Sequence, residues 1–131
     1  MCRILFLILI VTSSVAFAQT EENTGLRETP KAIKFDEFEK ATNGFVKWRM
    51  DAFFVELSNN PAAQGYIINY GTNKEVAKRE KQVRNSIAFR RYHTLRITFV
   101  RGENQEVIKT ELWLVPPGTE APTPVSQDKK D

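Results

Sequence analysis

Cysteine and histidine are almost absent from this chain, which has one of each among its 131 residues. His93 has no second histidine with which to form a metal pair, and the single cysteine is Cys2. A disulfide, a metal site built on these residues and a cysteine–histidine catalytic pair are therefore not expected within one chain. Neighbouring acids such as Asp36 and Glu37 could in principle cleave a glycan, but solvated charges are the simpler interpretation. We predict a protein that is not an enzyme and holds no cofactor or metal.

Hydrophobic runs long enough to cross a membrane are also missing. The longest apolar run is at the N-terminus. Arg3 precedes the apolar run Ile4 to Val11, and the Ala-Phe-Ala sequence at 16–18 has the form of a signal-peptidase site. The run is too short to cross a bilayer as a helix. We therefore predict that residues 1–18 are a signal peptide and that the protein is exported, to the periplasm or as a secreted protein. Small exported proteins without disulfides are more typical of bacteria than of animal cells.

Apolar residues are scarce at both ends of the remaining chain. Residues 19–32 are polar, and Pro116-Pro117-Gly118 opens a tail of proline, threonine, serine and charged residues. Segments of this composition do not bury enough apolar surface to fold. We expect a disordered N-terminal segment at 19–32, one domain at 33–115 and a disordered, proline-rich tail at 116–131.

Strand and helix patterns alternate within the expected domain. Four apolar residues spaced by four, three and four positions predict a helix with one buried face: Val46, Met50, Phe53 and Leu57. Asn43 is the candidate N-cap of this helix, and Asn59-Asn60-Pro61 ends it. The other expected elements are strands at 33–38, 66–70, 96–100 and 107–115, and a second helix from Thr72 or Asn73 to about Phe89. This β-α-β-α-β-β order predicts an α/β domain of the α+β sandwich type, with two helices packed on one mixed sheet and the last two strands paired as a hairpin.

The last expected strand has two faces of different composition. One face carries Ile108, Thr110, Leu112 and Leu114, and we expect it to face the core. Trp113 lies on the other face, with Val107, Lys109, Glu111 and Val115. We expect Trp113 either to be covered by a terminal segment or to be available as a binding anchor.

Acidic residues are scarce in one stretch of the domain. From Lys74 to Arg101 the chain has nine lysines and arginines against two acids, a local charge of +7. Such a stretch is either a solvated basic surface or a site for an anionic partner, such as cell-wall polymer, lipid head groups or nucleic acid. Nucleic acid is the weakest of these partners, because the aromatic residues in the stretch match no RNA-binding strand motif. We expect no nucleic-acid binding and no transmembrane span.

Several segments together resemble the peptidoglycan-binding domain at the C-terminus of OmpA-like outer-membrane proteins. They are the Phe-containing first strand, the helix end Leu57-Ser58-Asn59-Asn60-Pro61, the strand Gly65 to Tyr70, the basic helix segment Lys78 to Ile87, and the strand start Arg96-Ile97. The resemblance depends on segment order and length more than on identities. It implies an OmpA-like fold and a ligand from the bacterial cell wall.

The resemblance also implies a two-residue clamp for the diaminopimelate of the wall peptide. Arg79 stands eight residues before Ile87 and matches the family's arginine, whose planar fork suits a carboxylate. The family's aspartate has no counterpart, because the corresponding residues are Tyr70-Gly71-Thr72-Asn73. We therefore expect Arg79 to be exposed beside a concave loop, with Thr72 or Asn73 in place of the aspartate.

Two functions remain open at this point. The first is a non-enzymatic envelope module that binds peptidoglycan or another anionic wall component. Its candidate ligand-binding residues are Arg79, Thr72, Asn73, Lys78, Lys81 and Arg84. The alternative is a secreted protein–protein interaction domain that keeps the fold and has lost wall binding, using the last strand or the Trp113 face.

Overall fold

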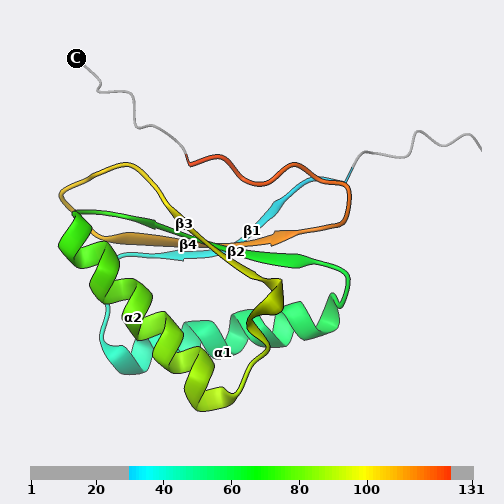
Figure 1. The fold of residues 1–131 in the computed structure, drawn as a ribbon, viewed down its shortest axis with the longest axis horizontal. Helices are drawn as coiled ribbons and strands as arrows, with labels where there is room; N and C mark the ends of the chain where they lie inside the picture. The colour runs from blue at the N-terminus through cyan, green and yellow to red at the C-terminus, as the bar shows by residue number, and fades with distance from the viewer. Residues whose placement is uncertain (1–29, 125–131) are drawn as a thin grey trace, which may run out of the picture.

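The computed structural model describes residues 30–124, which fold in the expected order β-α-β-α-β-β (Figure 1). The elements are β1 (Ile33–Phe38), α1 (Asn43–Asn59), β2 (Gln64–Tyr70), α2 (Asn73–Arg90), a 3₁₀ turn η1 (Thr94–Arg96), β3 (Ile97–Arg101) and β4 (Lys109–Val115). The prediction of an α+β domain with two helices on one mixed sheet is confirmed. The predicted signal peptide and the end of the tail lie outside the described residues.

The sheet has the strand order β1-β4-β2-β3. β4 is antiparallel to both β1 and β2, and β3 runs parallel to β2. The predicted β3–β4 hairpin is therefore wrong. The connection between these strands is long enough to carry the chain past β2, and β4 buries side chains on both of its faces, which suits a central strand. The parallel β2–β3 pair is joined through α2, as such pairs require.

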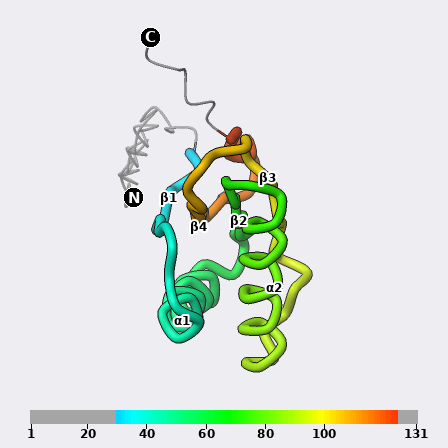
Figure 2. Tube along the Cα trace, turned by 90° about the vertical axis from the view of Figure 1, so that its left-hand side faces the viewer, coloured from blue at the N-terminus to red at the C-terminus, as the bar shows by residue number. Residues whose placement is uncertain are grey.

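Both helices cover the same face of the sheet, as the view along the strands shows (Figure 2). α1 begins after Thr42, whose hydroxyl accepts a hydrogen bond from the backbone N–H of Phe45. Thr42, and not the predicted Asn43, is thus the N-cap. α1 ends at Asn59, before Pro61, as predicted. The core between helices and sheet includes the apolar face expected for α1, together with Phe38, Ile67, Val83, Leu112 and Leu114.

The opposite face of the sheet is also partly covered. Ile68 and Tyr70 point to this face, because Ile67, the residue before Ile68, points to the helices and side chains alternate along a strand. Both are fully buried. The chain after β3 closes over Tyr70: a Cβ added to Gly102 would lie 2.2 Å from a carbon of the Tyr70 ring. Glycine is therefore required at position 102 for this close approach.

The segment after β4 returns over the same face of the sheet (Figure 1). We expected a disordered tail from residue 116. The structure describes the first part of this tail, residues 116–124, which contains no helix or strand. The Thr119 N–H donates to the Pro116 carbonyl at 3.2 Å, and the Thr119 hydroxyl donates to the Pro30 carbonyl at 3.0 Å. The first bond closes a turn within the tail, and the second attaches the start of the tail to the chain before β1. Within residues 30–124, neither helix has the length and apolar character needed to cross a membrane.

Candidate functional site

The basic stretch from Lys74 to Arg101 separates into cations with structural partners and cations without them. Arg101 forms an ion pair with Glu80, and Arg90 forms one with Asp51 on α1. Arg96 donates to four backbone carbonyl groups at the C-terminal end of α1. These three arginines bind within the protein, so the anion-binding capacity of the stretch is smaller than its charge of +7 indicates.

Arg84 and the lysines of α2 lie at the surface. The Arg84 guanidinium lies over the Phe99 ring, 4.1 Å from its centroid, on the β3 side of α2. Lys78 and Lys81 are exposed, and neither has an ion pair within the described part of the chain. Of the predicted ligand-binding residues, Lys78 and Lys81 are therefore the exposed cations available to an anion, and Arg84 points elsewhere.

Arg79 is buried, with 3% of its surface exposed. The expectation that Arg79 would be exposed beside a loop is therefore wrong. Its position on α2 gives the reason: Val76 and Val83 lie three residues before and four residues after it, and both are buried. Arg79 shares their inward face, so its side chain enters the space between α2 and the sheet.

Hydrogen bonds hold the Arg79 guanidinium, but no carboxylate does. Nη1 donates to the Thr110 hydroxyl at 2.8 Å, and Nη2 donates to the Glu39 carbonyl at 2.9 Å. The Phe38 ring lies 4.9 Å from the guanidinium carbon, a cation–π distance. Burial lowers the pKa of Arg79, although arginine keeps its charge in proteins. The described part of the chain thus contains a buried cation without an acidic partner.

The polar network continues from Arg79 into the sheet. The Thr110 hydroxyl donates to Oδ1 of Asn69 at 2.8 Å, on the neighbouring strand β2. Both side chains are fully buried, and Nδ2 of Asn69 has no hydrogen-bond partner among residues 30–124. Thr110 was predicted to face the core, but the sequence gave no indication that it would meet an arginine there.

A cavity of about 120 Å³ opens at Arg79. It is lined by Lys40, Ala41, Glu75, Lys78, Arg79, Gln82 and Ile108, and we call it the Arg79 cavity. Glu75 brings a carboxylate to the arginine's surroundings that our sequence analysis missed. Its position four residues before Arg79, one helical turn away, was the available signal.

Thr72 and Asn73 do not line the Arg79 cavity. Thr72 is the N-cap of α2: its hydroxyl accepts from the Glu75 N–H at 3.4 Å and donates to the Glu75 carboxylate at 2.9 Å. Asn73 is the exposed first residue of α2. Thr72 therefore acts on the cavity indirectly, because it holds the Glu75 side chain.

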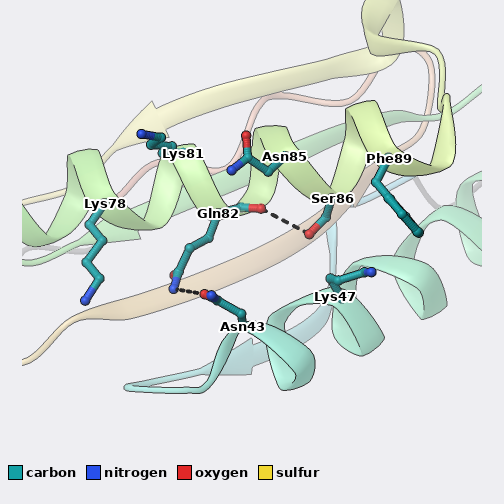
Figure 3. A pocket seen from close by; sticks show the side chains of 8 residues that line it. All are labelled: Asn43, Lys47, Lys78, Lys81, Gln82, Asn85, Ser86 and Phe89. Carbon is teal, nitrogen blue, oxygen red and sulfur yellow. Dashed lines mark hydrogen bonds between the residues drawn. The ribbon is translucent and has the colours of Figure 1, made fainter.

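A larger hollow lies between α1 and α2, on the side away from the sheet (Figure 3). Its volume is about 380 Å³, and its lining consists of Asn43, Lys47, Lys78, Lys81, Gln82, Asn85, Ser86 and Phe89. We call it the lysine groove. It shares Lys78 and Gln82 with the Arg79 cavity, so the two hollows adjoin along α2.

The neighbouring acids of β1 have structural partners. Asp36 binds Arg49 on α1, and Glu37 binds Lys34 on its own strand. No group of three or more residues suited to hold a metal ion occurs within residues 30–124.

Comparisons with known proteins give no further information. No family model matches the chain, and searches of the curated proteins and of the solved structures found no significant match. The function must therefore be inferred from the residues of the chain itself.

Proposed function

We propose that the protein is an exported, non-enzymatic binding module of the bacterial envelope and that it binds an anionic wall component, with peptidoglycan as the first candidate. The observation that carries the proposal is the buried Arg79 guanidinium, which lines a cavity and has no acidic partner in the described part of the chain. Burying a charge without a counter-ion is costly. A carboxylate that enters the cavity would supply the missing charge.

Arg79 has the donors needed for such a ligand. A guanidinium has five N–H groups, and the bonds to Thr110 and Glu39 use two of them. Arginine binds carboxylates through paired N–H donors. Lys40 and Lys78 at the rim of the cavity add positive charge that would favour the entry of an anion.

Glu75 extends the match to a ligand with both charges. It lines the same cavity as Arg79, and one of its oxygens accepts from Thr72 while the other is available. Because Glu75 offers a negative charge close to Arg79, the pair suits a ligand with a carboxylate and an ammonium group on one carbon. The resemblance to OmpA-like domains implies such a ligand, the diaminopimelate of the wall peptide. In this proposal Glu75 takes the role that our sequence analysis gave to Thr72 or Asn73.

The proposal is tested by co-sedimentation of the mature chain, residues 19–131, with diaminopimelate-type peptidoglycan. Arg79→Lys keeps the buried charge and removes the fork, and Glu75→Gln removes the second charge of the clamp. We expect both variants to pellet less than the unchanged protein. Lys74→Gln is the matched control, because Lys74 is exposed on α2 and lines neither hollow. Absence of pelleting by the unchanged protein, or equal pelleting by every variant, would contradict the proposal.

Binding of a protein partner is the second candidate, and α1 offers a surface for it. Trp48 and Val55 lie seven residues apart on the outward face of α1, and 61% and 59% of their surfaces are exposed. Phe45 lies beside Trp48, with ring centroids 5.9 Å apart. The surfaces first considered fit less well: both edges of β4 are paired, and Trp113 donates to Glu111. In this alternative, a protein partner would bind to the outward face of α1.

A further inference from the structure

The lysine groove has a net positive charge. Three of its lining residues are lysines, and none is acidic. Lys78 and Lys81 have no ion pair within residues 30–124, and the nearby Asp51 of α1 is held by Arg90. The groove therefore has no counter-charge of its own in the part of the chain that the structure describes.

The start of α1 adds to this positive potential. Asn43, the first residue of α1, lines the groove, and the first turn of the helix contains no acidic residue. Helix N-termini carry a partial positive charge that favours anions, phosphate groups among them. Asn43 is fixed across the groove by a 2.5 Å hydrogen bond from Gln82 of α2 (Figure 3). The two helices thus present the groove as one preformed surface.

The lining indicates which anion fits. The cations that line the groove are all lysines, which bind phosphate as point charges, and no arginine fork, which pairs with either a carboxylate or a phosphate, lines it. A volume of about 380 Å³ is larger than a lone anion needs and lies in the range of small-molecule sites. Phe89, with 67% of its surface exposed, gives the groove an apolar wall, and the Lys47 ammonium lies 3.8 Å from its ring centroid.

We propose that the lysine groove binds a phosphate-bearing ligand whose organic part lies against Phe89. This site goes beyond the proposed wall-binding function, because Lys47, Lys81 and Phe89 take no part in the Arg79 cavity. The phosphate group can belong to a soluble phosphorylated metabolite or to the head group of an anionic phospholipid. Both sources have the same chemistry at the lysines, and the experiment separates them.

Calorimetric titrations of residues 19–131 with fructose 1,6-bisphosphate and with inorganic phosphate test the soluble source. Flotation with vesicles of phosphatidylglycerol, against vesicles of phosphatidylcholine, tests the lipid source. We expect the bisphosphate or the phosphatidylglycerol vesicles to bind, and to bind more tightly than inorganic phosphate. The Lys47→Gln/Lys81→Gln variant should bind about tenfold more weakly, since it loses two ion pairs to the ligand.

The matched control is Lys31→Gln/Lys74→Gln, which loses the same charge at two exposed lysines outside the groove. It should keep the affinity of the unchanged protein. The inference is overturned if neither the bisphosphate nor the phosphatidylglycerol vesicles bind, or if the groove variant and the control bind equally. Arg79→Lys and Glu75→Gln, which should reduce pelleting with peptidoglycan, change residues that do not line the lysine groove, so both variants should keep the affinity for the phosphate ligand. Failure of phosphate binding and failure of wall binding are therefore distinguishable.

Discussion

Glu111 is a buried carboxylate at the centre of the sheet face opposite the helices. Only 3% of its surface is exposed. Lys109 and Lys34 donate to one oxygen at 3.0 and 3.3 Å, and Trp113 and Tyr70 donate to the other at 3.0 and 3.2 Å. Burial alone would raise the pKa of Glu111, but the hydrogen bonds from Lys109 and Trp113 and the charges of the two lysines outweigh it. The pKa therefore lies below the ordinary 4.5.

This lowered pKa predicts a loss of stability in acid. A carboxyl group whose pKa is lower in the folded protein stabilises it fully above the ordinary pKa, and the contribution disappears as the pH falls through the lowered value. We expect Glu111→Gln to reduce the free energy of unfolding at neutral pH by about 1–3 kcal/mol. The difference from the unchanged protein should shrink below a pH of about 4.5. Urea unfolding over a pH series measures this difference in the free energy of unfolding, with Glu106→Gln as the control for loss of an exposed acid. A difference that does not change with pH would contradict the role given to the Glu111 carboxylate.

Individual residues show where sequence patterns inform and where they do not. Strand alternation correctly placed Leu112 and Leu114 in the core and Trp113 on the other face. Helix periodicity equally places Arg79 between Val76 and Val83 on the buried face of α2, but the resemblance to a ligand-binding arginine led us to expect exposure. The contacts of Arg79 with Thr110 and Glu39 could not be predicted, because they join segments whose distance depends on the completed sheet.

At the scale of elements, Arg96 fastens the end of α1 to the start of β3. Its Nη1 donates to the carbonyls of Asn60, Pro61 and Ala63, and its Nη2 donates to that of Leu57, at 2.9–3.2 Å. The last carbonyls of a helix have no partner within the helix and carry a partial negative charge. One guanidinium thus satisfies the C-terminal end of α1 and the turn that follows it.

Replacing Arg96 should therefore destabilise the protein as a whole. We expect Arg96→Ala to lower the free energy of unfolding by about 1–3 kcal/mol, because it leaves four carbonyls without a charged donor, and the bonds to those of Leu57 and Ala63 are partly buried. Arg96→Lys should recover only part of this loss, since an ammonium cannot reproduce the fork. Chemical denaturation measures both changes, with Lys74→Ala as the control for loss of a surface charge. A stability of Arg96→Ala equal to that of the control would show that these bonds do not contribute.

The bounds of the elements were predictable, but their pairing was not. The helix that ends before Pro61 and the strand at 33–38 follow from local patterns, and the structure has them within a residue or two of the expected positions. A hairpin between β3 and β4 was the simplest pairing of neighbouring strands. The structure instead places β4 between β1 and β2, a pairing decided by how β4 buries both of its faces and not by any local signal.

At the scale of the whole molecule, β4 is the last strand in sequence and completes the sheet, because it lies between β1 and β2. Among the described strands, β1 pairs only with β4, and β2 pairs with β4 and β3. Without β4, β1 has no neighbour, and the core loses Leu112 and Leu114 beneath the helices. β4 thus joins the N-terminal strand β1 to the rest of the sheet. The native sheet therefore requires contacts between residues that are distant in sequence.

Truncation tests this dependence. A chain of residues 19–105 ends before β4, and we expect it to show no cooperative thermal unfolding by circular dichroism, because β1 and α1 lose the strand against which they pack. A chain of residues 19–120 keeps β4 and the bond from Thr119 to Pro30, so it should unfold cooperatively, at a temperature close to that of the chain of residues 19–131. Cooperative unfolding of the shorter chain would mean that α1, β2, α2 and β3 form a stable unit by themselves. In that case β1 and β4 would be additions to a smaller core, and the Arg79 cavity, which depends on Thr110 of β4 and on the residues after β1, would form only when they are added.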